Sequence, residues 1–221
     1  MTWPHPPDTQ SSKRRAAVVR LILPVVAAGL ALSGCQSVPD PTTSPTSQES
    51  TVKTSEFSTL DAAGVDSIRA SGAAKLDMSS GKLEKSAVQV TPDSFGPEIN
   101  TRDAGKIALS ITAPDGEITA QTDRIRFNTT ASRSDFSEVT FFLTAASDQE
   151  YFGLIRDAVT RYGIDAGSAE RWISGTEADP SGKSDFAITA GTSTGLEVTY
   201  DLRFNGETGS RVIMVHVRPL D

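Results

Sequence analysis

The sequence has few of the residues on which most catalytic and metal sites depend. Its 221 residues include one cysteine and two histidines, and beyond residue 5 the only histidine is His216. One cysteine excludes an intramolecular disulfide framework and a zinc site built from cysteine pairs. Because the rest of the chain has neither a second histidine nor a free thiol, we expect no Ser–His or Cys–His pair. We also predict neither a G-x-S-x-G nucleophile elbow nor a phosphate-binding loop. We therefore expect no resident metal or cofactor.

Basic charge, aromatic residues and long apolar runs are also scarce. The formal net charge is −7, aromatic residues make up 6% of the chain and hydrophobic residues 37%. A nucleic-acid binder needs concentrated Lys and Arg to contact phosphates, so we expect no nucleic-acid partner. The composition also excludes a membrane protein with several spanning helices and fits an acidic globular domain.

The N-terminal segment has the organisation of a secretion signal. Basic residues between Lys13 and Arg20 precede an apolar run of 12 residues, Leu21 to Leu32. A membrane-spanning helix needs roughly 20 apolar residues, so this run is too short for a permanent anchor. It ends in Leu32-Ser33-Gly34-Cys35, which resembles the lipobox of bacterial lipoproteins: an aliphatic residue, two small residues and a cysteine. Residues 1–34 are therefore predicted to be a lipoprotein signal peptide.

The lipobox resemblance implies a chemical modification and a location. The thiol of Cys35 would be joined to diacylglycerol, and cleavage would leave this cysteine as the new N-terminus. The implied partner is the lipid bilayer, and the implied location is the extracytoplasmic side of the cell membrane. The pair Arg14-Arg15 leaves open whether export uses the general or the twin-arginine route.

The next segment, residues 35–56, reads as a lipidated cysteine and its tether. Thirteen of the 21 residues in 36–56 are Ser, Thr or Pro. Such a composition buries too little apolar surface to offset the entropy of ordering, so we predict a disordered spacer. The folded part is then a single domain over residues 57–221.

Hydrophobic periodicity in that domain predicts an α+β fold. Alternating residues predict strands, and three- and four-residue spacing predicts helices. The last strand has apolar residues on both faces, so we place it centrally in the sheet. We expect an antiparallel sheet with a helical hairpin and an N-terminal helix packed on one face. The predicted helices span about 57–71, 148–162 and 166–174. Capping boxes begin at Ser58 and Ser147, and the three helices are expected to stop at Gly72, Gly163 and Gly175. The predicted strands span about 86–91, 107–113, 118–120, 125–127, 139–145, 186–190, 196–204 and 211–218.

Several features raise the question of a functional site. We interpret His216 as a structural residue of the last strand. The acidic loop 177–185 offers carboxylates and hydroxyls, but its spacing does not match a calcium loop. Glu197 and Asp201 lie two steps apart on the polar face of a strand and resemble a glycosidase pair only in being two carboxylates. Trp172 and Tyr162 have helical spacing that favours core positions over a pocket.

Three functions remain open. The first hypothesis is a membrane-anchored envelope module that binds a ligand or partner without catalysis. The second is a carrier of an apolar ligand such as a lipid, which requires an apolar cavity between Phe141, Tyr151 and the terminal strands. The third is a carboxylate-dependent cell-wall hydrolase, which requires two converging carboxylates, one of them with a raised pKa.

Overall fold

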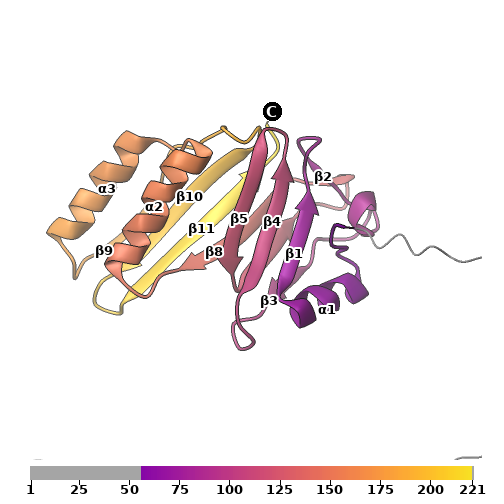
Figure 1. The fold of residues 1–221 in the computed structure, drawn as a ribbon, viewed down its shortest axis with the longest axis horizontal. Coiled ribbons are helices and arrows are strands. Elements are labelled where there is room, and N and C mark those ends of the chain that lie inside the picture. The colour runs from indigo at the N-terminus through magenta and orange to yellow at the C-terminus, as the bar shows by residue number, and fades with distance from the viewer. Residues whose placement is uncertain (1–55, 221) are drawn as a thin grey trace, which may run out of the picture. The chain divides into compact units, whose positions relative to one another are not determined.

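The computed structural model describes residues 56–220 and has helices packed on mostly antiparallel strands (Figure 1). The α+β fold class predicted from the sequence is therefore confirmed. The described residues belong to one compact unit. The lipobox, Cys35 and the predicted tether as far as residue 55 lie outside the described residues.

The helical hairpin consists of α2 (Asp148–Tyr162) and α3 (Ala166–Ala178). Ser147 caps α2 by accepting a hydrogen bond from the backbone N–H of Glu150, and Gly163 ends it at φ 72°, as predicted. Helix α3 runs past Gly175, where we predicted its end. Thr176 is buried and its hydroxyl donates to the carbonyl of Trp172. Burial of this extra turn offsets the roughly 1 kcal/mol that a glycine costs inside a helix.

The N-terminal helix, α1 (Ala62–Ser71), ends at Gly72 as predicted but begins later than expected. Its cap is Asp61, whose carboxylate accepts a hydrogen bond from the backbone N–H of Gly64 at 3.0 Å. Ser58, the cap suggested by the sequence, instead accepts from the backbone N–H of Lys75 at 3.0 Å. The residues before α1 therefore run beside the first strand.

The larger sheet has six antiparallel strands in the order β3-β6-β8-β11-β10-β9. The last strand, β11, lies inside the sheet as predicted, because it pairs with β8 and with β10. The edge strand β9 begins and ends three residues earlier than predicted, and Phe186 in it remains 39% exposed because no strand lies beyond it. The strands are β3 (Glu98–Asn100), β6 (Arg124–Asn128), β8 (Glu138–Thr144), β9 (Lys183–Ala187), β10 (Glu197–Asn205) and β11 (Ser210–Arg218).

A second sheet has three strands, β1 (Ala73–Asp77), β4 (Ile107–Ala113) and β5 (Gly116–Thr122). Strands β4 and β5 form a hairpin around Pro114 and Asp115, whereas β1 pairs with β4 in parallel. A two-stranded ladder joins β2 (Leu83–Glu84) to β7 (Asp135–Phe136). The sequence predicted strands at β4 and β5, but it predicted neither β1, β2 and β7 nor the division into separate sheets.

The strand predicted over residues 86–91 is wrong. Residues Ser86–Val88 form a 3₁₀ turn, η1. The backbone N–H groups of Val88 and Val90 both donate to the carbonyl of Lys85. The segment therefore makes its backbone hydrogen bonds within a turn instead of with a neighbouring strand. The buried ammonium of Lys85 donates to the carbonyls of Pro92 and Thr130 at 2.6 and 2.9 Å and ties this turn to a second loop.

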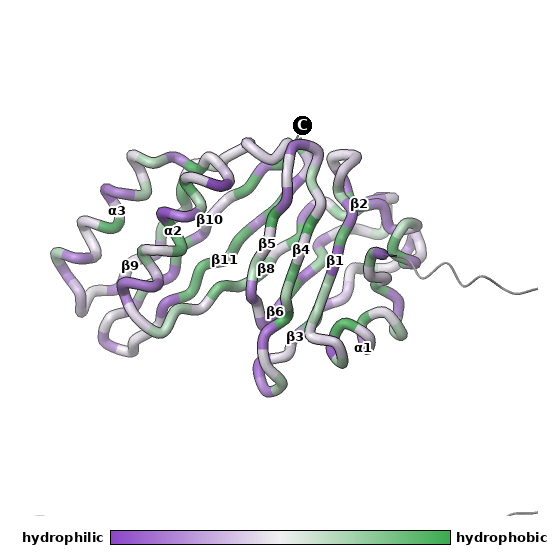
Figure 2. Tube along the Cα trace, viewed as in Figure 1, coloured by the Kyte–Doolittle hydropathy of each residue, from purple (hydrophilic) through white to green (hydrophobic). Residues whose placement is uncertain are grey.

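One face of the six-stranded sheet carries the core. Ile125, Phe141, Val215 and Tyr200 lie side by side across four strands of this face, and all are buried. Helices α2 and α3 cover the β9–β11 side, and the three-stranded sheet covers the side of β8, β6 and β3 (Figure 1). Apolar stretches of the strands lie beneath these covers, while polar residues recur along α2 and α3 (Figure 2). The single face therefore has two separate covers.

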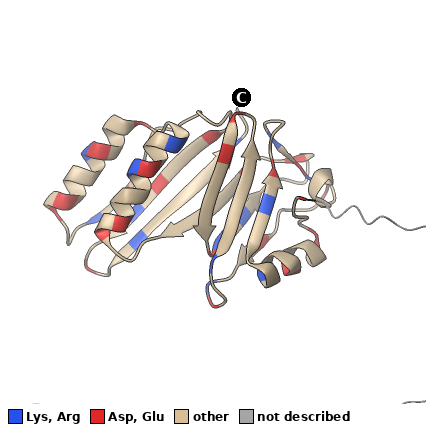
Figure 3. Cartoon of the chain, viewed as in Figure 1, with Lys and Arg blue, Asp and Glu red and all other residues tan. Residues whose placement is uncertain are grey.

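The opposite face of the six-stranded sheet is polar. It carries ion pairs between neighbouring strands, such as Arg124 and Arg126 with Glu98 at 2.8 and 2.6 Å. Both guanidinium groups also lie over the ring of Phe142, which is thereby almost fully buried. Charged residues recur on α2 and α3 as well (Figure 3).

Candidate ligand-binding groove

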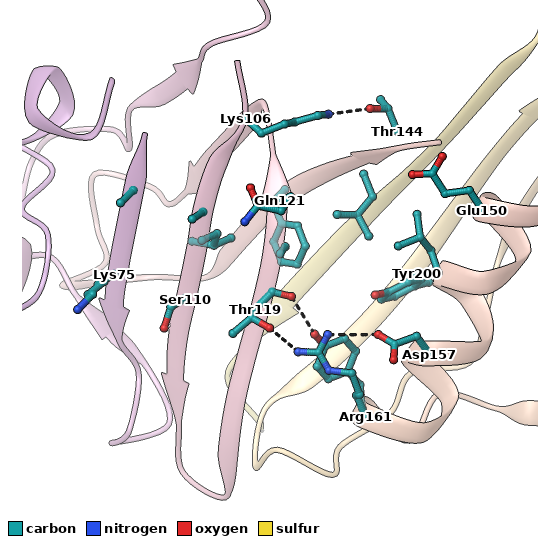
Figure 4. Close-up of a pocket in the computed structure, with 18 residues that line it drawn as sticks. Lys75, Lys106, Ser110, Thr119, Gln121, Thr144, Glu150, Asp157, Arg161 and Tyr200 are labelled. Carbon is teal, nitrogen blue, oxygen red and sulfur yellow. Dashed lines mark hydrogen bonds and ion pairs between the residues drawn. The ribbon is translucent and has the colours of Figure 1, made fainter. Parts of the chain in front are cut away.

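A groove opens where the two covers stand apart, between helix α2 and strand β5 (Figure 4). Its volume is about 660 Å³, within the range of roughly 300–1,000 Å³ that is usual for small-molecule sites. The lining comes from α2, from the three-stranded sheet and from the part of the six-stranded sheet that lies between them.

The floor of the groove is apolar. Phe141 and Leu143 rise from β8 and Tyr200 from β10, with exposed fractions of 1%, 7% and 3%. Leu154 contributes an apolar wall from α2. These three floor side chains are packed on most sides, and Leu154 is half-buried, so together they form an apolar bottom to the groove.

The wall on the sheet side is built from small side chains. Ala73 and Ala108 lie in one row across the outer face of the three-stranded sheet, and Ser110 and Thr119 lie in the next. Thr119 meets Arg161 of α2 through its hydroxyl, and the three shorter side chains leave the rest of the groove wide. The signal for this wall in the sequence is that the residues between the buried positions of β4 are small as well as polar; the alternation alone predicts only a half-buried strand.

Hydrogen bonds join the two covers near one end of the groove. The hydroxyl of Tyr162 donates to the carbonyl of Thr119 at 3.3 Å, and Arg161 donates to the hydroxyl of the same threonine. Asp157 pairs with Arg161 at 3.2 Å, so the guanidinium charge is balanced. These contacts fix the separation of α2 and β5 at this point.

The other end is bounded by a lysine. The ammonium of Lys106 lies 3.0 Å from a carboxylate oxygen of Asp123 and 2.8 Å from the hydroxyl of Thr144. Glu150 lies near this end and accepts a hydrogen bond from the backbone N–H of Ala146 at 2.7 Å. Both ends of the groove are thus polar, and the middle is apolar.

The cavity predicted between Phe141 and Tyr151 is displaced from its expected place. Phe141 does line the groove, but Tyr151 is fully buried among aromatic rings that include Trp172 and Phe204. The prediction that Trp172 belongs to the core agrees with this cluster. Tyr162 is also buried, yet it lines the groove, which the sequence did not indicate.

The candidate pair Glu197 and Asp201 lies on the polar face of the six-stranded sheet and does not line the groove. Glu197 pairs with Arg218 at 2.9 Å, and Asp201 pairs with Arg203 at 2.7 Å. His216 belongs to the same face and lies 3.0 Å from Glu138. These side chains form a network of ion pairs and do not converge on a cleft.

Glu138 is the centre of that network. Burial alone would raise the pKa of Glu138, but hydrogen bonds from His216 and Thr140 and the charge of Arg218 lower this pKa to about 2. The group therefore stays ionised at neutral pH. It holds β8 to β11 through His216 and Arg218.

The acidic loop 177–185 does not form a cation site. Asp185 pairs with Arg203 at 3.3 Å, and Ser184 accepts a hydrogen bond from the indole of Trp172 at 3.0 Å. Within residues 56–220, no three His, Cys, Asp or Glu side chains are placed to hold a metal ion.

The sequence does contain the residue spacing of a nucleophile elbow, so the prediction that this motif is absent is wrong. Residues 191–195 read Gly-Thr-Ser-Thr-Gly. An elbow requires a turn from a strand into a helix, whereas this segment is the loop that leads into β10. The backbone N–H of Ser193 donates to the carbonyl of Tyr162 at the end of α2, and His216 is engaged with Glu138. No serine–histidine pair is formed here.

In the part of the chain that the structure describes, no helix has the length and apolarity needed to cross a membrane. Comparisons with protein-family models, with curated proteins and with solved structures found no match. The geometry of the groove is therefore the basis for assigning a function.

Proposed function

We propose that this protein is a membrane-anchored lipoprotein of the bacterial envelope that binds an apolar or amphipathic small molecule in the groove between α2 and β5. The observation that carries the proposal is the apolar strip of Phe141, Leu143, Leu154 and Tyr200 along a groove of about 660 Å³. A ligand seated on this strip would displace water from the groove, and the apolar surface that it covers contributes about 25 cal/mol for each Å².

In this proposal, the lipid anchor holds the ligand-binding groove close to the membrane. The lipobox around Cys35 supports attachment to the membrane, and the Ser/Thr/Pro-rich segment that follows supports a spacer. A tethered domain that accepts amphipathic molecules would act close to the bilayer. The proposal combines the first two functions suggested by the sequence, a binding module and a carrier.

The charges around the groove favour binding over hydrolysis. Glu150 accepts a backbone hydrogen bond and Asp157 is paired with Arg161, so both carboxylates are engaged. The carboxyl groups with a displaced pKa all have it lowered, which stabilises the ionised form; they are Asp77, Glu98, Glu138, Asp165 and Glu170. A hydrolase of the predicted kind needs a carboxyl group with a raised pKa, so the hydrolase alternative has no comparable support.

A direct test uses the chain from residue 36 onward. It contains every core residue, from Leu60 to Val217, and lacks the apolar signal and the acylated cysteine. Nile red, a neutral apolar fluorophore, should bind with a blue-shifted and enhanced emission. Ala108→Phe should fill the groove from its small-residue wall and weaken binding by about tenfold or more, equivalent to about 1.4 kcal/mol.

The matched control is Ala187→Phe, which makes the same change at another exposed strand alanine outside the groove. This variant should bind Nile red like the unaltered chain. Equal affinity in both variants, or no binding at all, would refute the groove as a site for apolar ligands.

A further inference from the structure

The three tyrosines of the chain are all buried, but their hydroxyl groups differ. The Tyr151 hydroxyl accepts from the backbone N–H of Arg203 at 3.1 Å and donates to the carbonyl of Val212 at 3.1 Å. The Tyr162 hydroxyl donates to the carbonyl of Thr119. Among the described residues, the hydroxyl of Tyr200 has no hydrogen-bond partner, although the residue is only 3% exposed. The enclosed side-chain atoms without a partner in the described residues are Asp123 Oδ1 and Thr194 Oγ1, so the Tyr200 oxygen is not sealed in the core. Tyrosine hydroxyls in buried residues usually have a protein partner, whereas this one is left open to the groove.

The unpartnered hydroxyl belongs to the groove. Tyr200 projects from β10 into the space between α2 and β5, with its oxygen directed away from the sheet strand that carries it (Figure 4). Burial raises the pKa of Tyr200, so the phenol keeps its proton at neutral pH and remains a hydrogen-bond donor. A ligand seated on the floor would therefore meet one donor among apolar side chains.

The nearest charges select a neutral acceptor. Arg161 is already engaged by Asp157 and by the hydroxyl of Thr119, so it has no unbalanced charge to offer a ligand. Glu150 and Asp157 add negative charge to the lining, and Lys75 and Lys106 add positive charge. Lys106 is paired with Asp123, and Lys75 lies on β1, two strands beyond β5 (Figure 4). A ligand carboxylate placed at Tyr200 would be buried without a free cation beside it, which is costly, whereas a carbonyl oxygen needs only a donor.

We propose that the ligand is a neutral acyl compound, an ester or amide of a hydrocarbon chain, whose carbonyl oxygen accepts a hydrogen bond from the Tyr200 hydroxyl. Its chain lies along Phe141, Leu143 and Leu154, and its polar head reaches one of the two polar ends of the groove. This inference rests on the proposed function, because it requires the groove to be the ligand site. It adds the position and the chemistry of the polar contact.

The test compares two probes that differ at one carbonyl. These are 1-decanoylglycerol, an ester, and 1-O-decylglycerol, the corresponding ether, titrated below their micelle concentrations into the chain from residue 36 onward. One neutral hydrogen bond changes affinity by about 2- to 10-fold, so the ester should bind that much more tightly than the ether. Tyr200→Phe should abolish this preference while retaining binding of the ether.

Tyr151→Phe is the control variant. It removes a tyrosine hydroxyl that does not line the groove, so the folded protein should keep the preference for the ester. Because the ester-to-ether ratio of the unaltered chain is informative by itself, the test does not depend on any variant folding.

The outcomes separate the two proposals. Equal binding of ester and ether by the unaltered chain, or a preference that survives Tyr200→Phe, would overturn the role of Tyr200 and leave the groove as a binding site. Failure of both probes to bind the unaltered chain would overturn the proposed function itself.

Discussion

A hydroxyl group stabilises this fold only where the protein supplies its partners. Tyr151 reaches from α2 to the backbone of both β10 and β11, so its phenol fastens the helix to the sheet at a fixed place. Tyr200 buries its ring in the same core but gives its hydroxyl no protein partner. Two residues of the same type and similar burial therefore have different roles: one holds the structure and the other is available to a ligand.

This difference predicts opposite results for two identical substitutions. Tyr151→Phe should lower the free energy of unfolding by about 1–3 kcal/mol, because it leaves buried backbone groups of Arg203 and Val212 without their partner. Tyr200→Phe, without ligand, should change the stability by less than about 0.5 kcal/mol. Urea denaturation followed by circular dichroism measures both values. Equal losses in the two variants would mean that the Tyr200 hydroxyl is bonded within the protein.

The lowered pKa of Glu138 predicts a pH dependence of stability. Its folded-state pKa is about 2 and its ordinary value is 4.5. The stabilisation is therefore fully present above pH 4.5 and is lost as the pH falls from about 4.5 towards 2. Allowing for solvent screening, Glu138 should contribute up to about 2 kcal/mol at pH 7.

The measurement for Glu138 is the free energy of unfolding of the chain and of Glu138→Gln at pH 7 and at pH 3. The destabilisation caused by the substitution should be smaller at pH 3. Glu207→Gln, at an exposed turn residue, should have little effect at either pH. A destabilisation by Glu138→Gln that is the same at both pH values would contradict the role of its ionised form.

At the scale of elements, the sequence predicted correctly those features that depend on a few neighbouring residues. The cap at Ser147, the stop at Gly163 and the alternation in β10 were all predicted, because each depends on a few neighbouring residues. The segment 86–91 was misassigned because its valines are buried by a tight turn, and period-two spacing does not distinguish that turn from a strand.

The groove could not be predicted from local sequence patterns, because it depends on contacts between distant parts of the chain. It depends on where α2 stops relative to β5, and the contacts that fix this distance join Thr119 to Arg161 and Tyr162, about 40 residues apart in sequence. The pattern of α2 predicted an apolar face but not which residues of that face meet the sheet. Ile155 is fully buried, whereas its neighbour Leu154 is half-buried at the groove.

These two neighbours in α2 should respond differently to truncation. Ile155→Ala leaves a cavity in packed core and should cost about 2–5 kcal/mol of unfolding free energy. Leu154 faces a groove that is already open, so Leu154→Ala creates no enclosed cavity. It should lower the free energy of unfolding by about 1 kcal/mol or less. It should nevertheless weaken Nile red binding, which Ile155→Ala should leave intact in the folded fraction. A large stability loss for Leu154→Ala would indicate that the groove closes in solution.

At the scale of the whole molecule, the covered face of one sheet is divided between two covers. The helices α2 and α3 and the three-stranded sheet come from different parts of the chain, and they bury the apolar face except at the strip between them.

The lipobox predicts that Cys35 is the only attachment to the membrane. The chain is acidic, so anionic lipid headgroups repel it, and the acyl chains must supply the binding energy. Cys35→Ser should move the exported protein from the detergent phase to the aqueous phase in detergent partitioning. Ser37→Ala, just beyond the lipobox, should stay in the detergent phase. If exported Cys35→Ser protein remained with detergent, the domain itself would hold the membrane, and its groove would have to be considered as that contact.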